Sequence, residues 1–235
     1  MQIGKAFTAV LQDPQWVTKV LIGGLISLVP VVGTLIVLGY MMKTAQNVAA
    51  GVELPMPAWQ DFGDLIVQGL YGLLISIVYA LPLIVMYVVF VIIISLVGVG
   101  VEAGSAEAAS AAASLLGLGI LIALPIFFVL FLISLVLGCA ALGRYLQHGK
   151  LSDGLQVGQV IREVRSAPGP WFMVLLVAFL AGILASLGVI ACFVGVIFTQ
   201  FIAFVVNGHA IGQAMRQRGM IPQVTQPGYV PPQAF

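Results

Sequence analysis

The stretch that decides the fold runs from Leu65 to Val99 and reads LIVQGLYGLLISIVYALPLIVMYVVFVIIISLVGV. It contains no Asp, Glu, Lys or Arg. About 20 apolar residues carry a helix across the hydrocarbon core of a bilayer, so a run of this length must tilt, kink or extend into the interface. Pro82 is the expected kink, because proline removes a helix hydrogen bond and clashes with the preceding turn. The stretch predicts one long, proline-kinked membrane helix over about residues 65–99.

A second apolar run of the same kind occupies about residues 114–145. Its Ala123-Leu124-Pro125-Ile126 echoes Ala80-Leu81-Pro82-Leu83 of the first run, so both helices place a proline among apolar residues. Residues 100–113 are small, with two glutamates as their only charged side chains, and we expect them to form a compact loop. Two kinked helices joined by such a loop form an antiparallel pair.

Composition extends the membrane assignment to the whole chain. Of its 235 residues, 61% are hydrophobic and 7% are charged, whereas soluble domains carry about 25% charged residues. Nine Lys+Arg and eight Asp+Glu are too few to cover a soluble protein of this size with charge. This excludes a soluble globular protein, and the net charge of +1 argues against a nucleic-acid partner. We therefore expect lipid to surround the apolar surface of the chain.

Two further regions predict pairs of shorter membrane segments. Val17–Met42 is largely apolar, but Pro30-Val31-Val32-Gly33 in its middle favours a turn. A hairpin of segments at about 17–29 and 33–49 is preferred, although a single span also fits. Trp171–Ile211 is long enough for two spans, at about 171–188 and 195–215, with a turn near Gly188 to Gly195. The preferred total is six segments, and a single span in the first region would make it five.

Two short segments have the apolar periodicity of helices that lie on a membrane surface. They cover about residues 1–12 and about 154–166. Each is followed by a proline and a tryptophan and then by an apolar run, which suggests a weak internal duplication. Tryptophan suits the headgroup boundary. The expected interfacial anchors and helix caps are Trp16, Trp59, Asp61, Asp64 and Trp171.

Lys and Arg in short loops predict the orientation. The connection over residues 147–170 and the stretch 216–218 are basic, whereas residues 100–113 contain no Lys or Arg. We therefore expect the basic regions and both termini on the cytoplasmic side; five spans would leave Lys5 outside. Residues 1–218 are predicted to form one membrane domain. The tail, residues 219–235, is rich in Pro and Gln and is expected to be flexible.

Several short elements become recognisable when they are taken together. They are Asp13-Pro14-Gln15-Trp16, Leu38-Gly39-Tyr40, Leu54-Pro55, Trp59-Gln60-Asp61-Phe62-Gly63-Asp64 and Gly208-His209-Ala210-Ile211-Gly212-Gln213-Ala214. In this order they resemble the prokaryotic membrane-protein family filed as domain of unknown function 4013. The resemblance covers roughly Ile3 to Arg218, and Met56-Pro57-Ala58 stands as an apparent insertion. It implies a multi-pass protein of a bacterial or archaeal cytoplasmic membrane, and it carries over no activity.

Few side chains have a pattern that suggests catalysis or metal binding. Asp61 and Asp64 are closely paired and could act as acid and base. They precede an apolar helix, however, where carboxylates cap free N–H groups and meet the positive end of the helix dipole, and this role is preferred. A metal site would need His148 or His209 beside them, and the spacing does not indicate ligands. We expect no enzyme activity, cofactor or metal.

The two cysteines, Cys139 and Cys192, lie inside apolar runs without a partner at ligand spacing, and we expect them to pack without a disulfide.

The predicted spans lack ionisable residues in their central parts, which disfavours an ion-coupled carrier. They instead carry small residues at four-residue spacing, which allow helices to approach closely, within the chain or against a partner. These helix-packing candidates are Gly72, Ser76 and Ala80 on one helix and Ala178, Gly182 and Ser186 on another. A possible polar lining comprises Thr199, Gln200, Asn207 and His209, which could equally join helices.

These patterns favour an all-α, polytopic transmembrane bundle with two amphipathic interfacial helices. Its expected role is that of an accessory or scaffolding subunit, bound by membrane lipids and by other membrane subunits or a second copy. The alternative is a carrier or flippase-like protein for an apolar or amphiphilic molecule. A membrane-embedded enzyme ranks third and would require Asp61 and Asp64 to face a pocket together with a histidine.

Overall fold

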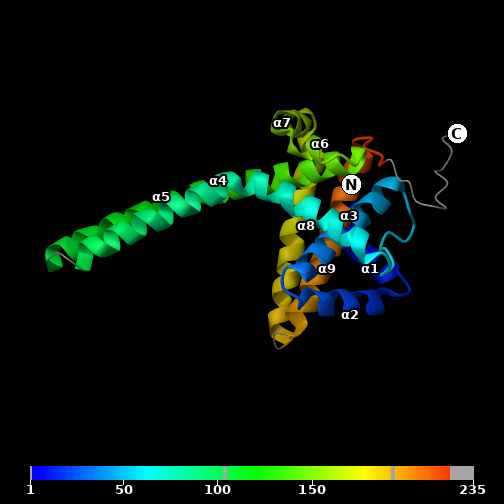
Figure 1. Cartoon of the computed structure of the whole chain (residues 1–235), viewed down its shortest axis with the longest axis horizontal. Coiled ribbons are helices and arrows are strands. Elements are labelled where there is room, and N and C mark those ends of the chain that lie inside the picture. Colours follow the sequence, from blue (N-terminus) through cyan, green and yellow to red (C-terminus); the bar gives the residue numbers. More distant parts are fainter. Residues whose placement is uncertain (1, 103–104, 192–193, 223–235) are drawn as a thin grey trace. The chain divides into compact units, whose positions relative to one another are not determined.

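The structure, a computed structural model, describes residues 2–102, 105–191 and 194–222 (Figure 1). These residues form α-helices, one short 3-10 helix and connecting turns, with no strand among them. The chain divides into two compact units. Unit 1 combines Met1–Ser76 with Val136–Phe235, and unit 2 is Ile77–Leu135. The predicted all-α class is confirmed.

Unit 2 consists of the later part of α4 (Phe62–Glu102) and the earlier part of α5 (Ala106–His148). The two helices run side by side, drawn from cyan to green in Figure 1. Both continue without interruption through their internal prolines, Pro82 and Pro125. The kinks expected at these two prolines stay predictions.

Both long helices extend further than the apolar runs that predicted them. Residues 100–113 were expected to form a compact loop that leads into a helix, and the loop is shorter than expected, because α4 continues to Glu102 and α5 begins at Ala106. Alanine has the highest helix propensity of all residues, and the stretch after position 105 is rich in it. Residues 103 and 104 lie outside the described part of the chain.

Unit 1 is built around α9 (Val194–Gln217), which contacts α1, α2, α3 and α8. The bounds of the other elements are α1 Ile3–Gln12, α2 Trp16–Ser27, α3 Val32–Ala50, α6 Leu151–Leu155, α7 Val157–Ser166, α8 Pro168–Leu187 and the 3-10 helix Gly188–Ala191. Phe201, Val206 and Met215 of α9 are fully buried. The core of unit 1 therefore surrounds a helix that is distant in sequence from α1, α2 and α3.

The first apolar region forms a hairpin, as preferred from the sequence. Helix α2 ends at Ser27 and α3 begins at Val32, with Pro30 in the turn and Val31 at a φ of +62°. The backbone N–H of Gly33 donates to the carbonyl of Val29 at 3.0 Å, which closes the turn. The alternative of one span over residues 17–42 is thereby excluded.

In unit 1, helices cross closely at positions where glycine has no side chain to separate the two backbones. A Cβ at Gly39 of α3 would overlap the backbone of Leu65, and a Cβ at Gly69 of α4 would overlap the backbone of Leu35. The two glycines thus let α3 and the first turns of α4 approach backbone to backbone. Such contact needs small residues on the facing helix.

Four helices among the described residues are long and apolar enough to cross a membrane. They cover Phe62–Val97, Ala109–His148, Pro168–Leu187 and Gly195–Gln217. Helix α2, with 12 residues, is shorter than the roughly 20 residues a span requires. The chain is thus a multi-pass membrane protein by its apolar helices, while the total of six segments stays a prediction.

The second predicted surface helix, about 154–166, corresponds to α7, and its first two residues belong to the short helix α6. Helix α6 ends at Leu155 and α7 begins at Val157, so the chain bends at Gln156. Gly154 lets α6 approach α4 closely, because a Cβ there would overlap the side chain of Ile75. Of the tail, residues 223–235 lie outside the described residues, as does Cys192.

Candidate functional site

The loop between α3 and α4, residues 51–61, is fixed by buried side chains that donate to three consecutive carbonyls. Asn47 Nδ2 donates to the carbonyl of Pro55 at 2.9 Å. Lys19 Nζ donates to the carbonyl of Met56 at 2.8 Å, and the Tyr40 hydroxyl donates to that of Pro57 at 2.9 Å. Backbone carbonyls buried away from water need such donors. The apparent insertion at Met56-Pro57-Ala58 is therefore an ordered part of the site.

Lys19 also forms a buried ion pair. Its Nζ lies 2.6 Å from Oδ2 of Asp13, and the side chains of Lys19 and Asp13 are 11% and 3% exposed. The second carboxylate oxygen of Asp13 accepts the backbone N–H of Gln15 at 2.8 Å. Both charges thus have partners, which buried charges require. The sequence analysis missed this pair; the only signal was a charged Lys placed inside an apolar segment.

Trp59, predicted to be an interfacial anchor, lies in an aromatic cluster of unit 1. Its ring stacks on that of Tyr40 with centroids 4.4 Å apart and lies 5.8 Å from that of Phe201. The indole N–H donates to the carbonyl of Lys19 at 3.1 Å. Phe62 stacks on the same indole at 6.0 Å. Trp59 therefore joins the loop, α2, α3 and α9.

The other two tryptophans differ from each other. Trp16 is half-buried at the start of α2. Trp171 has 0% exposure and lies beside Gly143. Its indole N–H has no hydrogen-bond partner among the described residues. The structure thus places Trp171 in the core of unit 1.

Asp61 and Asp64 lie at the start of α4, where the sequence placed them. The carbonyl of Asp61 accepts the backbone N–H of Leu65 at 3.2 Å. The carboxylate of Asp64 accepts Nζ of Lys43 at 3.1 Å and Nε2 of Gln68 at 2.9 Å. A cavity of about 450 Å³ lies beside both aspartates.

The two histidines lie elsewhere in unit 1. His148 Nδ1 is 3.1 Å from a carboxylate oxygen of Asp153, and His209 lines a different cavity. Among the described residues, no group of three or more His, Cys, Asp and Glu side chains could hold a metal ion. Neither histidine is among the described residues that line the cavity beside Asp61 and Asp64.

The two stripes of small residues have different surroundings. A Cβ at Gly72 would meet Sδ of Met42, and the Ser76 hydroxyl donates to the Gly72 carbonyl at 2.8 Å, so these positions pack inside unit 1. On α8, by contrast, a Cβ at Gly182 would meet nothing within 4 Å, and Ser186 is exposed. Ala80 and Ala178 are half-buried. The α8 stripe is open on its outer side.

The four residues of the expected polar lining do not surround one cavity. The Thr199 hydroxyl donates to the carbonyl of Ala185 at 3.0 Å and so joins α9 to α8. Gln200 is exposed, and Oδ1 of the half-buried Asn207 has no hydrogen-bond partner among the described residues. Of the four, His209 alone lines one of the cavities described here.

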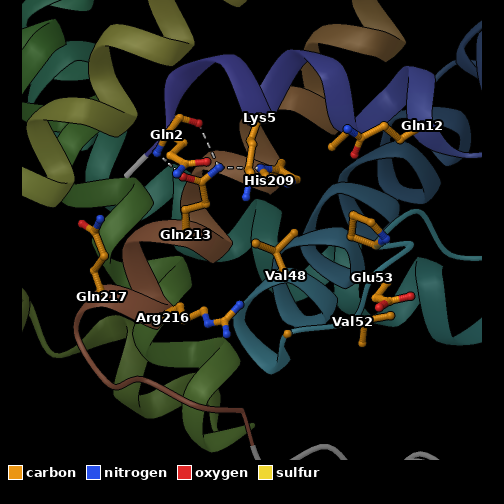
Figure 2. Close-up of a pocket in the computed structure, with 13 residues that line it drawn as sticks. Gln2, Lys5, Gln12, Val48, Val52, Glu53, His209, Gln213, Arg216 and Gln217 are labelled. Carbon is orange, nitrogen blue, oxygen red and sulfur yellow. Dashed lines mark hydrogen bonds between the residues drawn. The ribbon is translucent and has the colours of Figure 1, made fainter.

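The cavity at His209 has a volume of about 530 Å³ and lies between α1, the end of α3 and α9 (Figure 2). Lys5 reaches it from α1, Glu53 from the loop and Arg216 from α9. Gln213 connects α9 to the start of α1. Its Oε1 accepts the backbone N–H of Gln2 at 2.8 Å, and its Nε2 donates to the Gln2 carbonyl at 3.2 Å. No sequence pattern indicated this cavity, because its walls come from α1, from the end of α3 with the loop that follows it, and from α9, which are distant in sequence.

Unit 2 contains an apolar groove of about 580 Å³ between α4 and α5. Aromatic side chains and a glycine contribute to its walls, among them Tyr87, Phe90, Gly119 and Phe127. None of the described residues that line it is charged. The groove can accept an apolar group, and its walls supply no charge to fix a polar one.

Helix α7 is attached to the end of α9 by an ion pair. Arg218 Nε lies 2.6 Å from Oε1 of Glu163, and Arg218 Nη2 donates to the Ser166 hydroxyl at 3.0 Å. The hydrogen bond with Glu163 raises the pKa of Arg218 above its ordinary value, so the guanidinium stays charged. The polar face of α7 is therefore fixed to the residue that follows α9.

A family model described as "Protein of unknown function (DUF4013)" matches residues 22–194. The chain belongs to this family. The match includes the loop with its three bonded carbonyls, the long helices and α8, whereas Asp13–Trp16 and Gly208–Ala214 lie outside the matched residues. No curated protein matches the chain, and no solved structure matches it.

Proposed function

We propose that the protein is a non-catalytic membrane protein that serves as an accessory or scaffolding subunit of a larger complex in the cytoplasmic membrane. The observation that carries this proposal is the apolar surface of α4 and α5, most of which no other described part of the chain covers. Almost nothing of the spanning parts of α4 and α5 is buried within the chain. Lipid can cover such surface, but so can the helices of a partner subunit.

The open glycines favour a protein partner over lipid alone. In unit 1, Gly39 and Gly69 lie at close helix crossings, where their missing side chains admit a neighbouring backbone. Gly182 of α8 and Gly117 of α5 have the same small size, yet a Cβ on either would meet nothing within 4 Å. A second chain could approach these positions as closely as α3 approaches α4. Helix association in membranes depends on this kind of contact, because lipid is as apolar as the helices.

The test is purification of the tagged full chain in mild detergent, followed by native mass spectrometry. We expect protein partners at fixed stoichiometry, and we expect Gly182→Leu to reduce their recovery. Leu176→Phe is the matched control, since it also enlarges an exposed side chain of α8 but lies on another side of the helix. A solitary chain, or equal loss with both variants, would contradict the proposed role.

A second candidate is a carrier or flippase-like protein for an apolar or amphiphilic molecule. The uncharged groove of unit 2 favours it, because its volume of about 580 Å³ suits a small molecule or part of a lipid. Gly119→Leu should fill the groove, as a Cβ there has open space around it. If one apolar molecule is recovered with the wild-type chain and lost from Gly119→Leu, the carrier is supported in place of the accessory subunit.

A further inference from the structure

We propose that the cavity between α1, α3 and α9 binds a phosphate group, carried by a lipid headgroup or by a soluble molecule. The proposal is independent of the accessory role. It rests on three donors that line one cavity, Lys5 of α1 and His209 and Arg216 of α9. Figure 2 shows Lys5 beside His209, with Arg216 reaching in from the later part of α9.

The charges of Lys5 and Arg216 are not used inside the described part of the chain. Lys19, Lys43 and Arg218 each form an ion pair with a carboxylate. Within the same described residues, neither Lys5 nor Arg216 has an ion pair, although both line the cavity. Two cations and one exposed carboxylate, that of Glu53, are among the described residues that line the cavity, so this lining carries a net positive charge that attracts an anion.

The tautomer of His209 follows from the hydrogen bonds of Gln213. The amide orientation of Gln213 is fixed, because its Oε1 accepts the backbone N–H of Gln2. Its Nε2 is therefore the atom that lies 3.0 Å from Nδ1 of His209, and an amide nitrogen can only donate. Nδ1 must accept, so the ring proton is on Nε2. His209 thus offers an N–H donor from a side chain that is 9% exposed.

Arg216 is held beside the end of α3. Its guanidinium atoms lie 3.6–3.7 Å from the position that a Cβ on Gly51 would take. Gly51 has a φ of +83° and ends α3, whose free carbonyls favour a nearby cation. This contact orients the guanidinium without neutralising its charge, which leaves its N–H groups able to donate to an anion.

Phosphate fits these donors better than a singly charged carboxylate of similar size. Arg binds phosphate oxygens through paired N–H groups, and Lys binds them as a point charge. A phosphate monoester carries about −1.5 to −2 charges near pH 7, which two cations can balance. The cavity of about 530 Å³ also leaves room for the group that bears the phosphate.

Glu53 allows an independent test of how charge affects anion binding in this cavity. It is the one carboxylate among the residues that line the cavity, and it is exposed. Its negative charge opposes an anion, whereas Lys5 and Arg216 attract it. Removing Glu53 should therefore strengthen binding, while removing either cation should weaken it.

The experiment uses the purified full chain in detergent with two probes that both carry a phosphate monoester or free phosphate: inorganic phosphate and a short-chain phosphatidic acid. Binding is measured by the shift of the unfolding temperature and by native mass spectrometry at constant ionic strength. Lys5→Gln and Arg216→Gln should each weaken binding about ten-fold, the size of one lost charge-assisted hydrogen bond. Glu53→Gln should strengthen it. Lys150→Gln, which removes an exposed cation that does not line this cavity, is the control.

The two probes distinguish the source of the phosphate. Binding of inorganic phosphate assigns the site to soluble ligands, and binding of the lipid alone assigns it to a headgroup. The proposal is overturned if the wild type binds neither probe, or if Lys150→Gln loses as much affinity as Lys5→Gln. Should a cation variant fail to fold, the gain expected from Glu53→Gln decides, and unchanged binding in that variant also overturns it.

Discussion

Replacing Lys19 by methionine should destabilise unit 1 strongly. The side-chain ammonium of Lys19 donates to Asp13 at 2.6 Å and to the carbonyl of Met56 at 2.8 Å. Methionine keeps the length and the apolar stem but removes the charge and both hydrogen bonds. Asp13, whose side chain is 3% exposed, would then be a buried carboxylate without its cation. Breaking a buried pair on one side costs about 3–5 kcal/mol.

The matched control is Lys43→Met. Lys43 also pairs with a carboxylate, that of Asp64 at 3.1 Å, but the Asp64 side chain is 48% exposed. Water can solvate that carboxylate after the cation is lost, and exposed pairs contribute about 1 kcal/mol or less. The two variants make the same chemical change at sites that differ in burial. The difference between them therefore measures the effect of burial together with that of the hydrogen bond from Lys19 to the Met56 carbonyl.

The assay is unfolding of the full chain in mixed micelles by SDS titration, followed by circular dichroism. We expect Lys19→Met to lose about 3 kcal/mol or more of apparent unfolding free energy and Lys43→Met about 1 kcal/mol. Asp13→Asn combined with Lys19→Met should recover part of the loss, because the neutral amide retains an acceptor for the N–H of Gln15. Equal losses in the two single variants would refute the reasoning.

Two further predictions concern packing and orientation. Gly39→Val should lower the unfolding free energy by about 1–3 kcal/mol or more, because its side chain would overlap the backbone of Leu65; Gly182→Val in the same titration should change it far less, and the reverse order would disprove the close crossing. In a chain with both native cysteines replaced by serine, Lys5→Cys should react with a membrane-impermeant thiol reagent only after the cells are opened. Labelling of intact cells would reverse the proposed orientation.

The membrane helices could be predicted from the sequence because their signal is local. A long run without charge requires lipid or a buried helix wherever it lies, so Leu65–Val99 indicated a span without knowledge of its neighbours. Pro30 and Gly33 indicated the hairpin for the same reason, since both act on the backbone of the turn itself. Helix ends were less predictable: the alanines after residue 105 favour helix as strongly as they allow a loop.

The candidate sites could not be predicted, because they depend on contacts between distant residues. Gln213 meets Gln2 across almost the whole chain, and no local pattern announces that contact. Lys19 is a similar case, since an apolar segment with one cation does not show which carboxylate or carbonyl will pair with it. A buried charge in such a segment predicts that a partner exists, but the partner emerges only from the packing of helices α2 and α3 against the loop.

The distribution of polar groups separates the two proposals physically. The described residues that line the groove of unit 2 include no charged one, so an anion would lose its hydration there without a compensating charge, and the groove favours neutral, apolar molecules. The cavity of unit 1 has two cations, an imidazole donor and a carboxylate. Lys5→Gln should therefore alter phosphate binding while Gly119→Leu leaves it unchanged, and Gly119→Leu should alter the recovery of an apolar molecule while Lys5→Gln leaves that unchanged. A variant that altered both would contradict the assignment of separate ligands to the two units, and neither proposal would then stand in its present form.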